Sequence, residues 1–167
     1  MDALFHIVIA YVGGIILLKN LNVDFNLWVV FMLSVISLIV TDIDHFIDTG
    51  IPIFHNIFLL IIFPTIILLY LHSREKYNYF NYTLTLIVMF IGHLLTDMVE
   101  GMYGIPLFYP VSNRLYMIPE WLEIYLPLNH ASWIVSRLGI ALFLYFTLIL
   151  SIPIIFKFFS SDFSKGT

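Results

Sequence analysis

The sequence has no cysteine and few charged residues, and both absences narrow the classes of protein that it can encode. Without cysteine, neither a disulfide framework nor thiolate-ligated zinc is available. Charged residues make up 11% of the 167 residues, well below the average of about 25% in globular domains. The net charge is −4 and the chain has no basic run, so we expect no nucleic-acid partner.

Hydrophobic residues make up 61% of the chain and form long uninterrupted runs. A soluble core of this size could not bury so much apolar surface, so membrane lipid is the expected partner. Long runs favour helices over strands, and helices satisfy the backbone in lipid. Because a span needs about 20 apolar residues, the predicted fold class is all-α, a polytopic membrane helix bundle with about five transmembrane helices. These spans cover approximately residues 3–20, 25–41, 53–71, 82–98 and 133–156.

The predicted organisation is a single transmembrane domain over residues 1–160, followed by a short polar tail at 161–167. The longest connection, residues 98–132, contains several glycines and prolines and cannot be one regular helix. We interpret it as an irregular interfacial cap over the helix ends. Within the cap, residues 120–126 are predicted to form a short helix, because Pro119 suits a first turn.

The distribution of basic residues predicts the orientation, because Lys and Arg in short loops favour the cytoplasmic side. An external N-terminus and a cytoplasmic C-terminus in the cell membrane place five of the seven basic residues inside: Lys19, Arg74, Lys76, Lys157 and Lys165. This topology then places nearly all histidines, with several aspartates, at outer helix ends: His6, Asp42, Asp44, His45, His55, His93, Asp97 and His130. Only His72 falls on the other side.

His93 and Asp97 are four residues apart in an apolar span. This spacing puts both side chains on one face of a helix, where two ligands can hold a divalent metal. Ionisable groups at membrane depth are costly and usually mark a functional site. The alternative is a hydrogen-bonded pair that stabilises the end of the helix.

A second group of ionisable residues is the run Asp42-Ile43-Asp44-His45, which follows an apolar span directly. If the helix continues, Asp42 and His45 share a face, and Asp44 points elsewhere, toward another ion or a ligand histidine. The alternative is a solvated acidic loop that continues to Asp48.

His6, His55 and His130 are isolated histidines, and such residues are more often interfacial than metal-ligating. The combined set nevertheless favours a metal site, because a bound cation compensates buried carboxylates. Mixed imidazole and carboxylate ligands suit zinc best, and also manganese or ferrous iron. The number of candidate ligands allows one or two ions, since paired metals are common in phosphoester hydrolysis.

Residues 104–114 follow Asp97 closely and are expected to lie over the cluster. Arg114 could bind a phosphate or carboxylate group of a substrate through a two-pronged contact, and Tyr109 and Ser112 could donate hydrogen bonds. The alternative is an interfacial turn in which Arg114 reaches toward water.

In chain order, these motifs resemble the YdjM-like family of membrane-bound metal-dependent hydrolases. The matching elements are His6 with Gly13-Gly14, Asp42-Ile43-Asp44-His45, His55, Gly92-His93-x3-Asp97 and residues 104–112. The resemblance spans roughly residues 1–116 and implies a helical membrane protein with distant likeness to zinc-dependent phospholipases of the phospholipase C type. It implies the metal residues His6, Asp42, Asp44, His55, His93 and Asp97. Two features depart from the family: Thr41 stands where proline is usual, and a His-Arg-Gly element is absent.

Our leading hypothesis is a membrane-embedded hydrolase that attacks a phosphoester or other ester, such as a lipid, at the outer membrane face through metal-activated water. Asp44 and His45 are the candidate catalytic residues, with Asp44 as ligand or general base. The first alternative is a non-catalytic scaffold or subunit of a membrane assembly that metal stabilises. The second is a transporter, which the one-sided gathering of ionisable groups disfavours. The pattern leaves the oligomeric state open.

Overall fold

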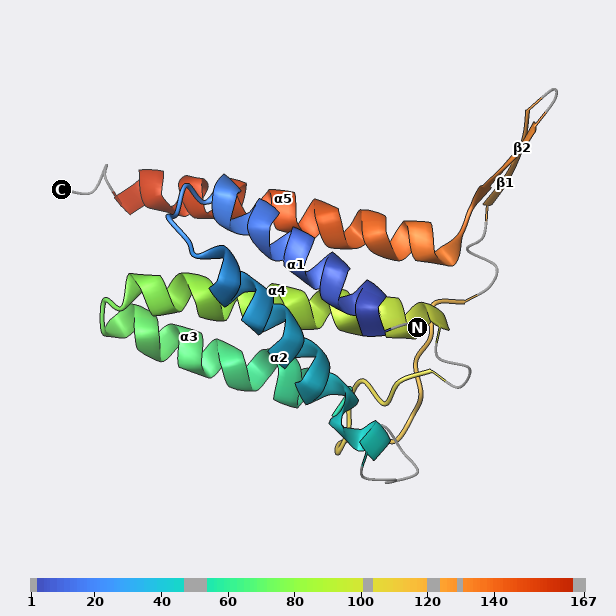
Figure 1. Ribbon diagram of the computed structural model, residues 1–167, viewed down its shortest axis with the longest axis horizontal. Helices are drawn as coiled ribbons and strands as arrows, with labels where there is room; N and C mark the ends of the chain where they lie inside the picture. Colours follow the sequence, from blue (N-terminus) through green and yellow to red (C-terminus); the bar gives the residue numbers. More distant parts are fainter. Residues whose placement is uncertain (1–2, 47–53, 101–103, 120–123, 129–130, 164–167) are drawn as a thin grey trace.

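The computed structural model describes residues 3–46, 54–100, 104–119, 124–128 and 131–163 (Figure 1). In this part of the chain the fold is all-α with five helices, as the apolar runs predicted. The helices are α1 (Ala3–Asn20), α2 (Leu27–Phe46), α3 (Phe63–Ser73), α4 (Tyr77–Glu100) and α5 (Arg137–Phe163). A π-helical turn, η1 (Phe58–Ile62), leads directly into α3.

Three of these helices, α1, α4 and α5, are long and apolar enough to cross a membrane on their own. The other two apolar segments, Leu27–Ile43 in α2 and Phe58–Ser73 across η1 and α3, are shorter. Large hydrophobic side chains such as Trp28, Ile66 and Phe143 are exposed on the outside of the bundle. Such a surface is suited to lipid rather than water.

Helix α4 is the central element and contacts each of the other four helices. In Figure 1 it lies between α5 and α3, while α1 and α2 cross in front of it. Its Leu84 and Val88 pack with Leu17 of α1 and with Tyr145 and Ile149 of α5. The C-terminal half of α4, which carries His93 and Asp97, is also enclosed, with Met89, Phe90 and Leu94 buried.

Two glycines allow α1 and α4 to pack closely against the ring of Tyr145 in α5. A Cβ atom on Gly13 would overlap the Tyr145 hydroxyl group, and one on Gly92 would lie 2.7 Å from Cε2 of the same ring. Any larger residue would push the helices apart, since real Cβ atoms do not approach that closely. Gly92 directly precedes His93, so this close contact lies next to the histidine in the chain.

The segment after α4 folds back over the end of the bundle. Ile105 and Tyr116 form an isolated antiparallel bridge, and buried Ile105 packs with Leu60, Phe90 and Leu94. Gly104 has a φ of 77° and its Cβ position lies 2.7 Å from the Tyr116 carbonyl oxygen, so the turn requires glycine. This part of the predicted cap is therefore anchored to η1 and α4.

The rest of the cap differs from the prediction. Strands β1 (Ile124–Leu128) and β2 (Ala131–Val135) pair antiparallel, with Ile124 opposite Val135. A helix over residues 120–126 is wrong for 124–126, and residues 120–123 lie outside the described part. The predicted last span began at residue 133, whereas α5 begins at Arg137. Aromatic and β-branched residues favour strands. The prediction of a helix relied on Pro119 at a first turn, a local signal that does not report pairing between strands.

Other helix boundaries also moved. Helix α2 continues past the predicted end at residue 41 to Phe46, so Asp42 lies on a helix. Helix α4 begins at Tyr77 rather than residue 82, directly after the turn at Glu75. Helix α5 extends to Phe163, into the region predicted as a polar tail.

Candidate metal centre

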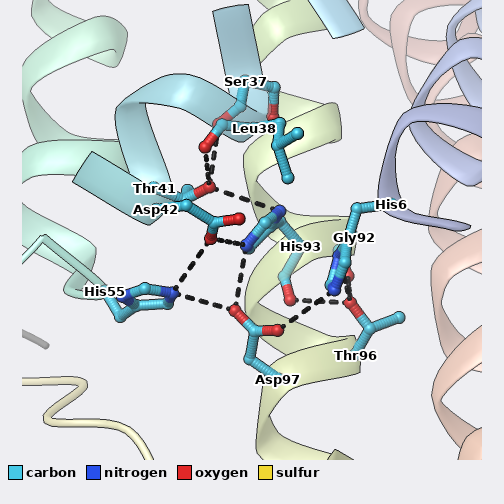
Figure 2. A network of polar contacts seen from close by, with 10 residues as sticks. All are labelled: His6, Ser37, Leu38, Thr41, Asp42, His55, Gly92, His93, Thr96 and Asp97. Atoms are coloured by element: carbon cyan, nitrogen blue, oxygen red, sulfur yellow. Dashed lines mark hydrogen bonds and ion pairs between the residues drawn. The ribbon is translucent and has the colours of Figure 1, made fainter. Parts of the chain in front are cut away.

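Five of the six predicted metal residues come together at one end of the bundle (Figure 2). They come from separate segments of the chain: His6 from α1, Asp42 from α2, His55 from the turn before η1, and His93 and Asp97 from α4. We call these five residues the His/Asp cluster. Their meeting depends on the packing of α1 and α2 against α4.

The carboxylate of Asp97 lies at the centre of the cluster. Its Oδ2 atom is 3.0 Å from Nε2 of His55 and 3.0 Å from Nε2 of His93. Its Oδ1 atom is 3.4 Å from Nε2 of His6. One carboxylate therefore faces three imidazoles, all through the same kind of ring nitrogen.

Asp42 provides a second carboxylate on the α2 side of the cluster. Its Oδ1 atom lies 3.2 Å from Nε2 of His93 and 3.8 Å from Nε2 of His55. Both aspartates thus share these two histidines. The result is a compact group in which imidazole nitrogens alternate with carboxylate oxygens.

The cluster is buried, but one side of it is more open. His6, His55 and His93 are only 7%, 3% and 5% exposed. The side chain of Asp97 is 16% exposed, and that of Asp42 is 26% exposed. Water or a small molecule would therefore approach the cluster most easily from the Asp42 side.

The geometry fits a metal ion. Two sets of three residues place their ligand atoms within 4.8 Å of one another: His6, His93 and Asp97, and Asp42, His55 and His93. Asp97 Oδ2 is buried, and its 3.0 Å contacts with the Nε2 atoms of His55 and His93 are ion pairs without regular hydrogen-bond geometry. Buried polar atoms are normally satisfied, and a cation between these atoms would satisfy this one. The donor set of nitrogen and oxygen suits several divalent metals.

Two threonines that the sequence reasoning missed contact the histidines from behind. Thr41 Oγ1 lies 3.3 Å from Nδ1 of His93, and Thr96 Oγ1 lies 3.2 Å from Nδ1 of His6. Both hydroxyl groups are buried. A signal existed in the sequence, because each threonine directly precedes an aspartate of the cluster.

The structure does not describe the side chains of three other predicted site residues. Asp44 and His45 lie on α2, but their side chains are outside the described part, as is the whole of His130. Their predicted roles stay predictions. His72, which was assigned no role, contacts the rings of Tyr77 and Phe80 near the start of α4, at the opposite end of that helix from Asp97.

The predicted substrate residues lie on the segment that folds over the bundle. Arg114 is exposed and stands over the Tyr116 ring at 5.7 Å, and its backbone N–H donates to Ser112 Oγ at 3.2 Å. In the described residues, these contacts of Arg114 are made within its own segment and not with the His/Asp cluster. Tyr109 lines an apolar groove of about 360 Å³ together with Phe54 and Asn56, which flank His55.

The fold and the cluster together define a polytopic helical membrane protein with a buried His/Asp site that could hold a metal ion. The chain belongs to the YdjM inner membrane protein family, whose model matches residues 1–161. The predicted family is thus confirmed, and the match extends well beyond the roughly 116 residues that carried the resemblance. No curated protein and no solved structure matches the chain.

Proposed function

We propose that the protein is a membrane-embedded, metal-dependent hydrolase that acts on a phosphoester or another ester at the membrane surface. The observation that carries the proposal is the environment of Asp97 Oδ2. This buried oxygen lies 3.0 Å from the Nε2 atoms of both His55 and His93, at ion-pair distance but without regular hydrogen-bond geometry. Imidazole nitrogens and carboxylate oxygens that converge in this way are what a cation site requires.

The residues of the cluster would share the binding of one or two ions. His6, His93 and Asp97 form one candidate set, and Asp42 and His55 form the other with the same His93. A bound divalent cation supplies Lewis acidity toward an ester and toward an attacking water. Asp42, the more exposed carboxylate, lies where that water would enter, and Asp44 or His45 is proposed as the general base.

The surroundings support a lipid as substrate. The groove of about 360 Å³ beside His55 is lined mainly by apolar side chains, including Phe58, Leu59 and Phe63. It would accept an acyl chain while the ester group lies over the cluster. Arg114 and Ser112, on the neighbouring segment, are the proposed contacts for a phosphate group, which arginine binds well. The outer membrane face is proposed from the distribution of basic residues.

A second function is favoured by the burial of the three imidazoles, each less than 10% exposed. If all five side chains of the cluster bind metal, no position remains for water. The metal would then tie α1, α2 and α4 together without catalysis, as structural zinc does in small domains. The protein would act as a scaffold or subunit.

Measuring the metal content and the ester-hydrolysing activity of the same protein preparation distinguishes the hydrolase from the structural role. We expect detergent-purified protein to contain about one or two divalent ions per chain by elemental analysis. It should hydrolyse a short-chain phospholipid or a nitrophenyl phosphodiester, and chelation should abolish this activity. Protein that carries no metal would refute both functions. Protein that carries metal but hydrolyses no ester in a panel of phosphoesters and carboxylesters would support the structural role.

A further inference from the structure

The same dipeptide, Thr-Asp, occurs in two helices of the His/Asp cluster, and each copy contacts one histidine through both ring nitrogens (Figure 2). The first copy is Thr41-Asp42 on α2, which contacts His93 of α4. Thr41 Oγ1 lies 3.3 Å from Nδ1 of that ring, and Asp42 Oδ1 lies 3.2 Å from Nε2. The imidazole is therefore held between a hydroxyl group and a carboxylate.

The second copy is Thr96-Asp97 on α4, which contacts His6 of α1 in the same way. Thr96 Oγ1 lies 3.2 Å from Nδ1, and Asp97 Oδ1 lies 3.4 Å from Nε2. The two contacts link the helices in series: α2 holds a histidine of α4, and α4 holds a histidine of α1. Thr96 and His6 are 90 residues apart in the chain.

The hydrogen-bond partners of the hydroxyl groups decide which ring nitrogen carries a proton. A threonine hydroxyl has one proton to donate and lone pairs to accept, whereas a carbonyl oxygen can only accept. Thr41 shares its one proton between the carbonyl oxygens of Ser37 and Leu38, each at 2.9 Å. The lone pairs of Thr41 Oγ1 can then accept a hydrogen bond from Nδ1–H of His93. In that tautomer, Nε2 of His93 carries a lone pair instead of a proton.

Thr96 has the same choice of partners. Its hydroxyl group donates to the carbonyl oxygen of His93 at 2.8 Å and to that of Gly92 at 3.1 Å. Its lone pair therefore accepts from Nδ1–H of His6. In both copies, this assignment of the hydroxyl protons leaves the nitrogen that faces the aspartates without a proton, which is the form that binds a metal.

The opposite tautomer fits the cluster less well. An Nε2–H group on His93 would offer a single proton to Asp42 Oδ1 at 3.2 Å and to Asp97 Oδ2 at 3.0 Å. The contact of Nε2 with Asp97 Oδ2 lacks regular hydrogen-bond geometry. If Nε2 of His93 instead carries a lone pair, a cation between Nε2 and the carboxylate oxygens would account for these short distances.

We propose that Thr41 and Thr96 are positioning residues that hold His93 and His6 as Nδ1–H tautomers and so present their Nε2 atoms to the metal. The inference rests on the proposed metal site and deepens it. Both hydroxyl groups are nearly inaccessible, with Thr41 0% and Thr96 3% exposed, so water cannot replace them. Partners of this kind typically change metal affinity about 10–100-fold.

The test uses valine and serine variants of the full chain in detergent. Thr41→Val and Thr96→Val keep the shape of the side chain and remove the hydroxyl group, whereas Thr41→Ser and Thr96→Ser retain it. Thr85→Val is the matched control, because Thr85 is also buried in α4 and donates to the carbonyl oxygen of Asn81 at 2.8 Å. The readouts are zinc affinity by chelator competition and ¹⁵N shifts of labelled histidine in the zinc-loaded protein.

We expect each valine variant to lose about 10–100-fold in zinc affinity, while the serine variants and Thr85→Val stay close to wild type. In wild type, the ¹⁵N spectra should show Nδ1 protonated on His6 and His93. Wild-type affinity in both valine variants, or protonated Nε2 on these rings, would overturn the inference while leaving the metal site in place. A wild type that binds no divalent cation would overturn the proposed function and this inference together.

Discussion

His93 Nε2 and Asp97 Oδ2 lie 3.0 Å apart, one turn from each other on α4, and every other residue of the His/Asp cluster contacts one of these two side chains. The pair therefore acts as the point at which α1, α2 and the turn before η1 meet α4. Both side chains lie on α4, which contacts all four other helices, and a metal site needs ligands that the surrounding packing holds in place.

The two aspartates should differ in importance. Asp97 contacts three imidazoles, whereas Asp42 contacts two and is more exposed. Loss of a residue that only hydrogen-bonds a metal ligand typically lowers metal affinity about 10–100-fold. We expect Asp97→Asn to lower zinc affinity by more than this, and Asp42→Asn to have a smaller effect than Asp97→Asn. Chelator competition measures both. Asp24→Asn, on an exposed loop, is the control, and equal affinity in all three variants would contradict the ranking.

Metal removal should lower thermal stability, because the ligands come from α1, α2 and α4. A ligand that binds only the folded state stabilises it by about 2.7 kcal/mol when present at 100 times its Kd. The melting temperature should therefore fall on chelation and recover when zinc is restored. Asp97→Asn should respond to neither treatment. A melting temperature of the wild type that is independent of metal would argue against a site that joins the helices.

Gly92→Ala should affect both stability and metal binding. Its Cβ atom would lie 2.7 Å from the Tyr145 ring, and overpacking of this kind costs about 1–3 kcal/mol. The strain would displace His93, the next residue, so zinc affinity should fall as well. Gly139→Ala is the matched control, since the nearest atom to its Cβ is 3.5 Å away. Similar unfolding curves for the two variants would show that the close packing is not required.

Ile105→Ala should loosen the segment that folds over the bundle. Ile105 is 3% exposed and packs with Leu60, Phe90 and Leu94, and loss of such a side chain costs about 2–5 kcal/mol. We expect faster proteolysis within residues 104–118 and a lower melting temperature. Val111→Ala, at a position that is 78% exposed, should change neither. Equal protease sensitivity of the two variants would mean that the segment is held by other contacts.

The predicted orientation can be tested by cysteine labelling, because the chain has no cysteine of its own. Val111→Cys lies at the cluster end of the molecule, and Ser73→Cys lies at the end of α3, next to Arg74; both positions are exposed. In intact cells, a membrane-impermeant maleimide should label Val111→Cys but not Ser73→Cys. The reverse pattern would place the cluster on the cytoplasmic side, contrary to the distribution of Lys and Arg.

Much of the local structure was predictable from sequence. Long apolar runs predicted the five helices, and the four-residue spacing of His93 and Asp97 predicted a shared helix face, because both signals depend on near neighbours. The paired strands at residues 124–128 and 131–135 were missed, because strand pairing joins residues whose partners are not set by helical periodicity. The roles of Thr41 and Thr96 were missed for a related reason, since each hydroxyl group acts on a histidine of another helix.

By itself, the sequence determined that the chain is a helical membrane protein with ionisable groups at one set of helix ends. Composition and periodicity suffice for that, because lipid permits few other backbone arrangements. Only the tertiary structure decided which of those groups meet. Gly13 and Gly92 leave room for the Tyr145 ring between the packed helices, and in that packing His6 of α1 lies 3.4 Å from Asp97 of α4. Such distances depend on side-chain packing between segments far apart in the chain. Local sequence patterns do not predict that packing.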